Sequence, residues 1–120
     1  MAHLINLKTV TDHRGSLTVI EKILPFDIKR VFYIYDVKSK RGEHRQKITT
    51  QALIALSGSV EIFCNNGKKQ ESFVLNNPGQ CLIVPPEDWH SMDKFSNGSV
   101  LLVLSSHEYD PQDIISERYT

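Results

Sequence analysis

Polar side chains suited to acid–base chemistry gather in two short segments of this 120-residue chain, each beside a run of strand-forming residues. The first segment runs from Arg41 to Lys47 and contains His44, and the second runs from Pro85 to His90. Imidazole titrates near neutral pH, so either histidine is a candidate general base. The residues alone leave two plainer interpretations open: His44 as an ordinary loop histidine, and His90 as a structural partner of the backbone.

Short runs of β-branched and aromatic residues, interrupted by turn residues about every ten positions, must hold these segments in place. Asn65-Asn66-Gly67 is the clearest hairpin signal, because Asn and Gly tolerate positive φ. Residues 38–42 are expected to form a charged loop, and residues 110–117 a short helix with Asp110 as N-cap and Pro111 in its first turn. The expected strands cover residues 4–10, 17–21, 30–37, 51–56, 59–64, 71–75, 81–84 and 99–105. The last of these is expected to be buried on both faces, since it is almost entirely Val and Leu. The pattern predicts a single all-β domain over residues 1–120, an antiparallel sandwich or barrel.

The net charge and the composition indicate which classes of binding partner the chain is suited to. Fourteen Lys and Arg balance fourteen Asp and Glu, which gives a net charge of zero and argues against nucleic acid as the main partner. A local basic pocket for one phosphorylated small molecule stays possible. Balanced charge also does not oppose self-association. Hydrophobic residues at 40% and charged residues at 23% are typical of a folded globular protein.

The apolar runs and the two cysteines indicate the cellular compartment of the protein. The longest apolar run is far shorter than the roughly 20 residues that span a bilayer, so no membrane partner is expected. The first ten residues lack the pattern of a secretory signal. Cys64 and Cys81 each lie inside an apolar run, which favours free buried thiols in a reducing cytoplasm over a disulfide.

The spacing in the two polar segments resembles that of the cupin family, whose fold is a jelly-roll β-barrel. Cupin motifs place glycines, histidines and an acidic residue so that three histidines and a glutamate converge on a metal inside the barrel. The matching positions here are His44, Gln46, Gln51 and His90. Amides are poor ligands for transition metals. We therefore expect a cupin-like barrel with no metal and no other cofactor.

A closer resemblance covers nearly the whole chain. The sequence is similar to the sugar-nucleotide 3,4-ketoisomerases, the WxcM-like family of small cupins that act on dTDP-4-keto-6-deoxyglucose. The matching segments are residues 12–17, 28–34, 41–44 with Lys47 and Gln51, 56–59, 89–92 and 109–114. The resemblance implies a homodimer that binds a dTDP-linked keto-deoxysugar inside the barrel. It also implies a reaction that moves the keto group from carbon 4 to carbon 3 through an enediol, in deoxysugar synthesis for surface polysaccharide.

The family uses two histidines in a His-x-His-Lys pattern, one as the carbon base and one to relay protons among the sugar oxygens. His44 matches the first, and Gln46 stands where the second belongs. A carboxamide can hydrogen-bond an enediol oxygen but cannot exchange protons near neutral pH. Three explanations stay open: His44 acts alone on one face of the sugar, His90 supplies the second function, or the protein is slow or inactive.

Substrate contacts are expected from five further side chains. The resemblance places Arg14 against the sugar, although a solvated turn arginine is the plain alternative. Arg41 either pairs with the diphosphate through its bidentate fork or is solvated. Gln51 is expected to form a hydrogen-bonding floor of the site. Tyr33 and Tyr35 alternate with apolar neighbours, so one pair of that strand is core and the other lines the barrel or stacks on thymine.

Two other functions suit the same residues. The same enediol chemistry permits epimerisation of a 4-keto sugar. Gln46 motivates a rival from another class, a non-catalytic cupin that binds a nucleotide sugar as a sensor or partner subunit. A metal-dependent dioxygenase is a more distant alternative.

Overall fold

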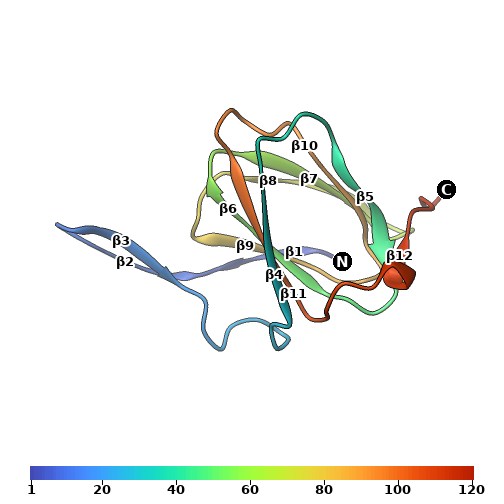
Figure 1. Ribbon diagram of the computed structural model, residues 1–120, viewed down its shortest axis with the longest axis horizontal. Coiled ribbons are helices and arrows are strands. Elements are labelled where there is room, and N and C mark those ends of the chain that lie inside the picture. Colours follow the sequence, from blue (N-terminus) through green and yellow to red (C-terminus); the bar gives the residue numbers. More distant parts are fainter.

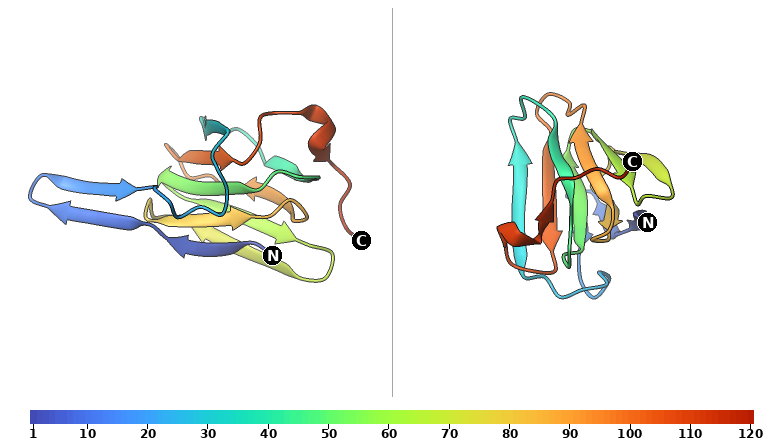
Figure 2. Two further views of the ribbon diagram at one scale, coloured as in Figure 1. Left: turned by 90° about the horizontal axis from the view of Figure 1, so that it is seen from below. Right: turned by 90° about the vertical axis from the view of Figure 1, so that its right-hand side faces the viewer.

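Two antiparallel β-sheets face each other in the computed structural model, which describes residues 1–120 (Figures 1 and 2). The first sheet has, in order across it, β1 (His3–Asn6), β9 (Gln80–Val84), β6 (Gln51–Ser57), β11 (Val100–Ser105) and β4 (Arg30–Tyr35). The second sheet has β12 (Ile114–Ile115), β5 (Arg41–Gln46), β10 (Trp89–Asp93), β7 (Val60–Asn65) and β8 (Gln70–Leu75). This is the expected all-β jelly roll.

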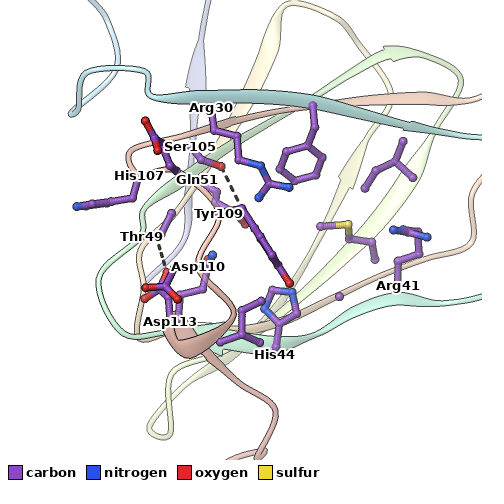
Figure 3. A pocket seen from close by; sticks show the side chains of 17 residues that line it. Arg30, Arg41, His44, Thr49, Gln51, Ser105, His107, Tyr109, Asp110 and Asp113 are labelled. Carbon is purple, nitrogen blue, oxygen red and sulfur yellow. Dashed lines mark hydrogen bonds between the residues drawn. The ribbon is translucent and has the colours of Figure 1, made fainter.

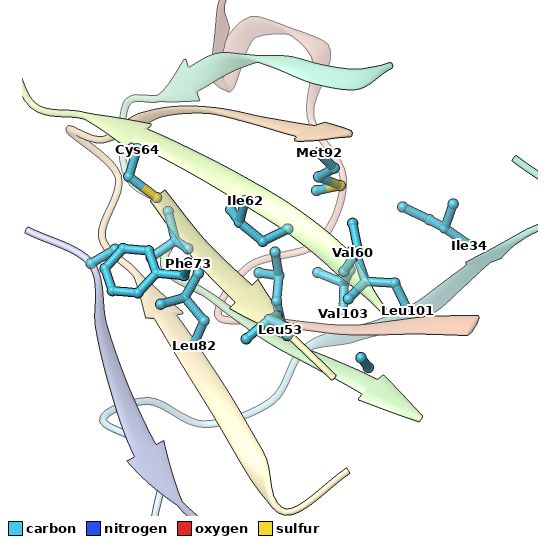
Figure 4. Packing of buried hydrophobic residues seen from close by; sticks show 14 residues of the cluster. Ile34, Leu53, Val60, Ile62, Cys64, Phe73, Leu82, Met92, Leu101 and Val103 are labelled. Carbon is cyan, nitrogen blue, oxygen red and sulfur yellow. The ribbon is translucent and has the colours of Figure 1, made fainter. Parts of the chain in front are cut away.

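The core lies between the sheets because alternate residues of each strand point inward. Leu53, Leu82 and Val103 from the first sheet, with Ile62 from the second, are at most 1% exposed and belong to one apolar cluster (Figure 4). Burying each such side chain contributes about 1.5–3 kcal/mol. The cluster fills one end of the space between the sheets, and the other end remains free for a pocket.

The outer face of the first sheet carries a second apolar cluster. Ile54, Ile83 and Leu104 point outward and are buried, because the segment after β3 packs Leu24 and Phe26 against them. The middle strands are therefore apolar on both faces, as the run of residues 99–105 predicted. This packing holds β6 and β11 rigidly, and both strands supply residues to the pocket.

A long hairpin projects from the barrel, formed by β2 (Lys8–Asp12) and β3 (Gly15–Val19) (Figure 1). The single strand expected over residues 4–10 is divided at Leu7, which is buried in the second apolar cluster while the chain on either side pairs with different partners. Leu7 N–H donates to Gly79 O at 2.8 Å, and this contact fixes the point where the hairpin leaves the sheet.

Two local predictions are wrong. The charged loop expected over residues 38–42 ends early, because Arg41 and Gly42 begin β5, which pairs with β10 and β12 despite its polar composition. The helix expected over residues 110–117 shortens to one 3₁₀ turn, Pro111–Asp113. Asp110 caps that turn as predicted, its side chain accepting from Gln112 N–H at 2.9 Å. Ile114 and Ile115 then extend as β12, because pairing with β5 satisfies their backbone groups.

The Asn-Asn-Gly turn and the free thiols are confirmed. Asn65 Oδ1 accepts from Gly67 N–H at 2.9 Å, and Gly67 adopts a φ of 89°. Cys64 and Cys81 are buried and unpaired. No helix of the structure has the length and apolar character needed to cross a membrane.

Candidate active site

A pocket of about 210 Å³ opens between the two sheets, at the end that the apolar core leaves free (Figure 3). That volume corresponds to roughly seven waters at about 30 Å³ each, comparable to one hexose ring. Strands β4, β5, β6 and β11 and the C-terminal segment from His107 to Ile114 form its walls. Four of the predicted site residues line it: Arg41, His44, Gln46 and Gln51.

A β-bulge in β5 aims His44 into this pocket. His44 pairs with His90 across the sheet, and the next pair is Gly42 with Ser91, so Glu43 has no partner. Gly42 and Glu43 both adopt positive φ, 80° and 60°. A side-chain carbon on Gly42 would approach His90 O to 3.1 Å, so the bulge needs glycine there.

His44 is a partly buried histidine whose environment favours the neutral form of its ring. Its Nδ1 atom is buried and has no hydrogen-bond partner in the protein. Burial lowers the pKa of His44 below its ordinary value, and the nearby Asp113 carboxylate opposes part of the shift. Gln51 Oε1, also at the pocket, is likewise buried and unpartnered, while its Nε2 donates to Ser105 Oγ at 3.4 Å. Buried polar atoms usually have a hydrogen-bond partner, so these two side chains retain unused hydrogen-bonding capacity beside the pocket.

His90 lies behind His44 and does not line the pocket. The two rings meet edge to face, with centroids 5.2 Å apart. His90 is 1% exposed, and its Nδ1 lies 3.4 Å from Asp88 O. Burial and the neighbouring His44 lower the pKa of His90 to about 4. His90 therefore packs against the His44 ring and is not part of the pocket wall.

Asp113 ties the C-terminal segment to the strand that carries His44. Its Oδ1 atom accepts from the backbone N–H groups of Lys47 and Ile48, each at 2.9 Å, and Oδ2 accepts from the Thr49 hydroxyl. Burial raises the pKa of Asp113, but these hydrogen bonds outweigh it and leave the pKa below its ordinary value. The carboxylate stays charged and fixes the turn after β5.

Three predicted contact residues lie outside the pocket. Tyr33 and Tyr35 stack on one another at 5.8 Å on the outer face of β4, and both are exposed. Phe32 and Ile34 take the inner face, so the pair that lines the barrel is the apolar one. Arg14 lies at the hairpin tip, where it pairs with Asp12 at 2.6 Å. Within one chain it cannot reach the pocket, because the hairpin projects away from the barrel (Figure 1).

The donor set does not favour a metal. No group of three or more His, Cys, Asp or Glu side chains is close enough to coordinate an ion. The side chains that line the pocket with His44 include two amides, Gln46 and Gln51, and the arginine Arg41.

Comparison with known proteins agrees with this geometry. The profile of the family described as "FdtA: WxcM-like, C-terminal" matches residues 1–120. The chain belongs to this family. It is 42% identical, over 94% of its length and 84% of the relative's, to a TDP-4-oxo-6-deoxy-α-D-glucose-3,4-oxoisomerase from Aneurinibacillus thermoaerophilus.

Solved structures of WxcM-like enzymes superpose closely. The sugar 3,4-ketoisomerase QdtA from Thermoanaerobacterium thermosaccharolyticum, in complex with TDP, is 43% identical with a TM-score of 0.92, over 97% of this chain and 88% of that one. The TDP-quinovose 3,4-ketoisomerase WlaRB from Campylobacter jejuni is 42% identical with a TM-score of 0.92, over 97% and 92%.

Sequence reasoning missed several pocket residues of this WxcM-like chain. They include Arg30, Thr49, Ser105, Tyr109 and Asp113. The family resemblance covers residues 109–114 but assigns them no role. Their only local signal was the Asp110 cap, because nothing in a sequence says which wall a terminal segment will cover.

Proposed function

We propose that this chain is a 3,4-ketoisomerase of a TDP-linked 4-keto-6-deoxyhexose, working through an enediol without a metal. The observation that carries the proposal is His44: a histidine whose pKa burial lowers, in the wall of a pocket of hexose size. The relatives at 42–43% identity are named as 3,4-ketoisomerases or 3,4-oxoisomerases of sugars, two of them of TDP-linked sugars. A role in deoxysugar synthesis for surface polysaccharide follows from that substrate class.

His44 removes the proton on carbon 3, which the neighbouring ketone acidifies, and later returns a proton to carbon 4. Gln46 and Gln51 hydrogen-bond the two sugar oxygens where negative charge develops, which stabilises the enediol. Arg41 lies at the pocket wall with an exposed guanidinium, suited to the diphosphate through its bidentate fork. His90 holds the His44 ring from behind.

We also propose that two copies pair through the β2–β3 hairpin. Val10 and Leu17 lie opposite each other on that hairpin and are 49% and 60% exposed, although they are apolar. A projecting apolar hairpin needs a covering surface, and a second copy supplies one. The predicted contact of Arg14 with substrate then requires the partner, since Arg14 is remote from the pocket of its own chain. The two free buried thiols suit a reducing compartment, so we propose the cytoplasm.

The direct test is incubation of the purified protein with dTDP-4-keto-6-deoxyglucose in deuterated water. NMR should show a new 3-keto sugar with deuterium at the exchanging carbon. His44→Asn should reduce the rate by about 10²–10⁴-fold while nucleotide binding persists. No product and no exchange at high protein concentration, with nucleotide-sugar binding retained, would assign the chain to the non-catalytic class. In that case Gln46→His should create activity from the zero baseline.

A further inference from the structure

The missing second histidine leaves an unsolved step in the proposed reaction. The isomerisation moves one hydrogen from carbon 3 to carbon 4 and one from the oxygen on carbon 3 to the oxygen on carbon 4. His44 can handle the carbon-bound hydrogen. Gln46 cannot handle the other, because a carboxamide does not exchange protons near neutral pH. His90 cannot handle it either, because it does not line the pocket.

Tyr109 is a proton-exchanging group in the right place. It lines the same pocket as His44, although the two residues come from different walls. Figure 3 shows the tyrosine side chain reaching across the cavity with its hydroxyl end toward the His44 ring. The hydroxyl has no hydrogen-bond partner within the protein, whereas Tyr119, the other C-terminal tyrosine, donates to Glu87 O at 2.8 Å.

Arg30 holds the Tyr109 ring through a cation–π contact. The Arg30 guanidinium lies 5.0 Å from the centre of the Tyr109 ring and 4.3 Å from that of Phe32. Arg30 forms no ion pair with a carboxylate, so its charge acts on these rings. A cation at this range is attracted to an aromatic face, so Arg30 helps to fix the orientation of the Tyr109 ring.

The segment that carries Tyr109 is fixed rather than loose. Asp110 caps the 3₁₀ turn, and Asp113 at the end of that turn accepts two backbone N–H groups from the residues that follow β5. Ile114 then pairs with Gln46 in the sheet. The chain therefore connects Tyr109 to the strand of His44 and Gln46 over five residues, which sets the hydroxyl against the site.

We propose that Tyr109 is a catalytic residue that relays the oxygen-bound proton in place of the absent histidine; this rests on the proposed ketoisomerase function. As His44 takes the proton from carbon 3, its electron pair forms the double bond to carbon 4, and the carbonyl oxygen there takes the proton of Tyr109. This gives an enediol, an imidazolium and a phenolate. The phenolate then takes the proton from the hydroxyl on carbon 3, which becomes the ketone, while the double-bond pair takes a proton at carbon 4 from His44. Both side chains return to their starting forms.

Tyr109→Phe tests this, because phenylalanine keeps the ring and its contact with Arg30. We expect kcat for isomerisation to fall by about 10²–10⁴-fold with KM for the dTDP-sugar nearly unchanged. Tyr119→Phe is the matched control, because Tyr119 is the other C-terminal tyrosine and does not line the pocket, and it should leave both constants unchanged.

A rescue variant separates proton relay from a structural role. In the Tyr109→Phe background, Gln46→His places an imidazole on the pocket side of β5 and should restore at least part of the lost rate. An unchanged kcat in Tyr109→Phe, a rise in KM alone, or a loss that Gln46→His does not restore would each overturn the proposal. Failure of the ketoisomerase function itself is distinguishable, because the unsubstituted protein would then be inactive.

Discussion

A histidine acts as a general base only while it is neutral, and burial keeps His44 neutral to lower pH than an exposed histidine. Its pKa lies below the ordinary 6.5, and the Asp113 carboxylate limits the shift. Because protonation removes the base, kcat/KM should fall on the acid side only below pH 6.5. A pH–rate profile with the dTDP-sugar checks this. An acid limb centred above pH 6.5 would contradict it. Asp113→Asn removes the charge that raises the pKa of His44, and it should move the limb further toward acid.

His90 makes the stability of the fold depend on pH. Its pKa is about 4 in the folded protein, against an ordinary value of 6.5, so the unfolded chain binds the proton more readily. The stabilisation is complete above pH 6.5 and is lost as pH falls toward 4. At pH 5 the loss should be about 2 kcal/mol.

The measurement for His90 is urea unfolding at pH 7 and pH 5. His90→Asn removes the titrating group but keeps a donor for Asp88 O, so it should lose less stability on acidification than the unsubstituted protein. His3→Asn, at an exposed histidine, should behave like the unsubstituted protein. Equal losses of unfolding free energy between pH 7 and pH 5 in all three proteins would show that His90 does not cause the pH dependence of stability.

At the scale of elements, strand β5 positions His44, and the β-bulge in this strand requires Gly42. Gly42→Ala should lower the free energy of unfolding by about 1–3 kcal/mol, because a side chain at positive φ is strained. The 3.1 Å approach of the added carbon to His90 O should increase that loss. Because β5 must shift, His44 moves and activity should fall more than stability. Calorimetric melting and kcat measure the two effects.

Gly98→Ala is the matched control for Gly42→Ala. Gly98 also has a positive φ, 75°, but a side-chain carbon there meets nothing within 4 Å. This variant should therefore show the backbone strain without the contact, and with normal kcat. Equal effects of the two substitutions on stability and kcat would show that the contact of Gly42 with His90 O does not position His44.

At the scale of the whole molecule, the projecting β2–β3 hairpin is the proposed dimer interface. The double substitution Val10→Asp with Leu17→Asp places charges on its paired apolar positions and should convert a dimer to a monomer. Light scattering after size exclusion measures this. Val74→Asp on β8, at a position 56% exposed, is the control and should stay dimeric. A monomeric unsubstituted protein, or a dimer that survives the double substitution, would contradict the proposed interface.

Local patterns in the sequence predicted most of the strands, because side chains alternate along a strand and turn residues end it. The Asn-Asn-Gly hairpin and the buried strand over residues 99–105 followed from this alone. The position of His44 in a family motif also gave the main candidate base. The strand β5 was missed because Arg, Glu and Gln have low strand propensity, and only its pairing with β10 and β12 makes it a strand.

What the sequence determined about this protein is therefore its fold class, most of its strands and its two candidate bases, His44 and His90. Alternation says that Phe32 and Tyr33 face opposite sides, but not which side is the inside. That choice, the remoteness of Arg14 and the approach of Tyr109 to His44 were decided by tertiary structure. They depend on which sheets face each other and on where the C-terminal segment crosses them. Such contacts join residues that are far apart in the chain, and local sequence patterns do not predict them.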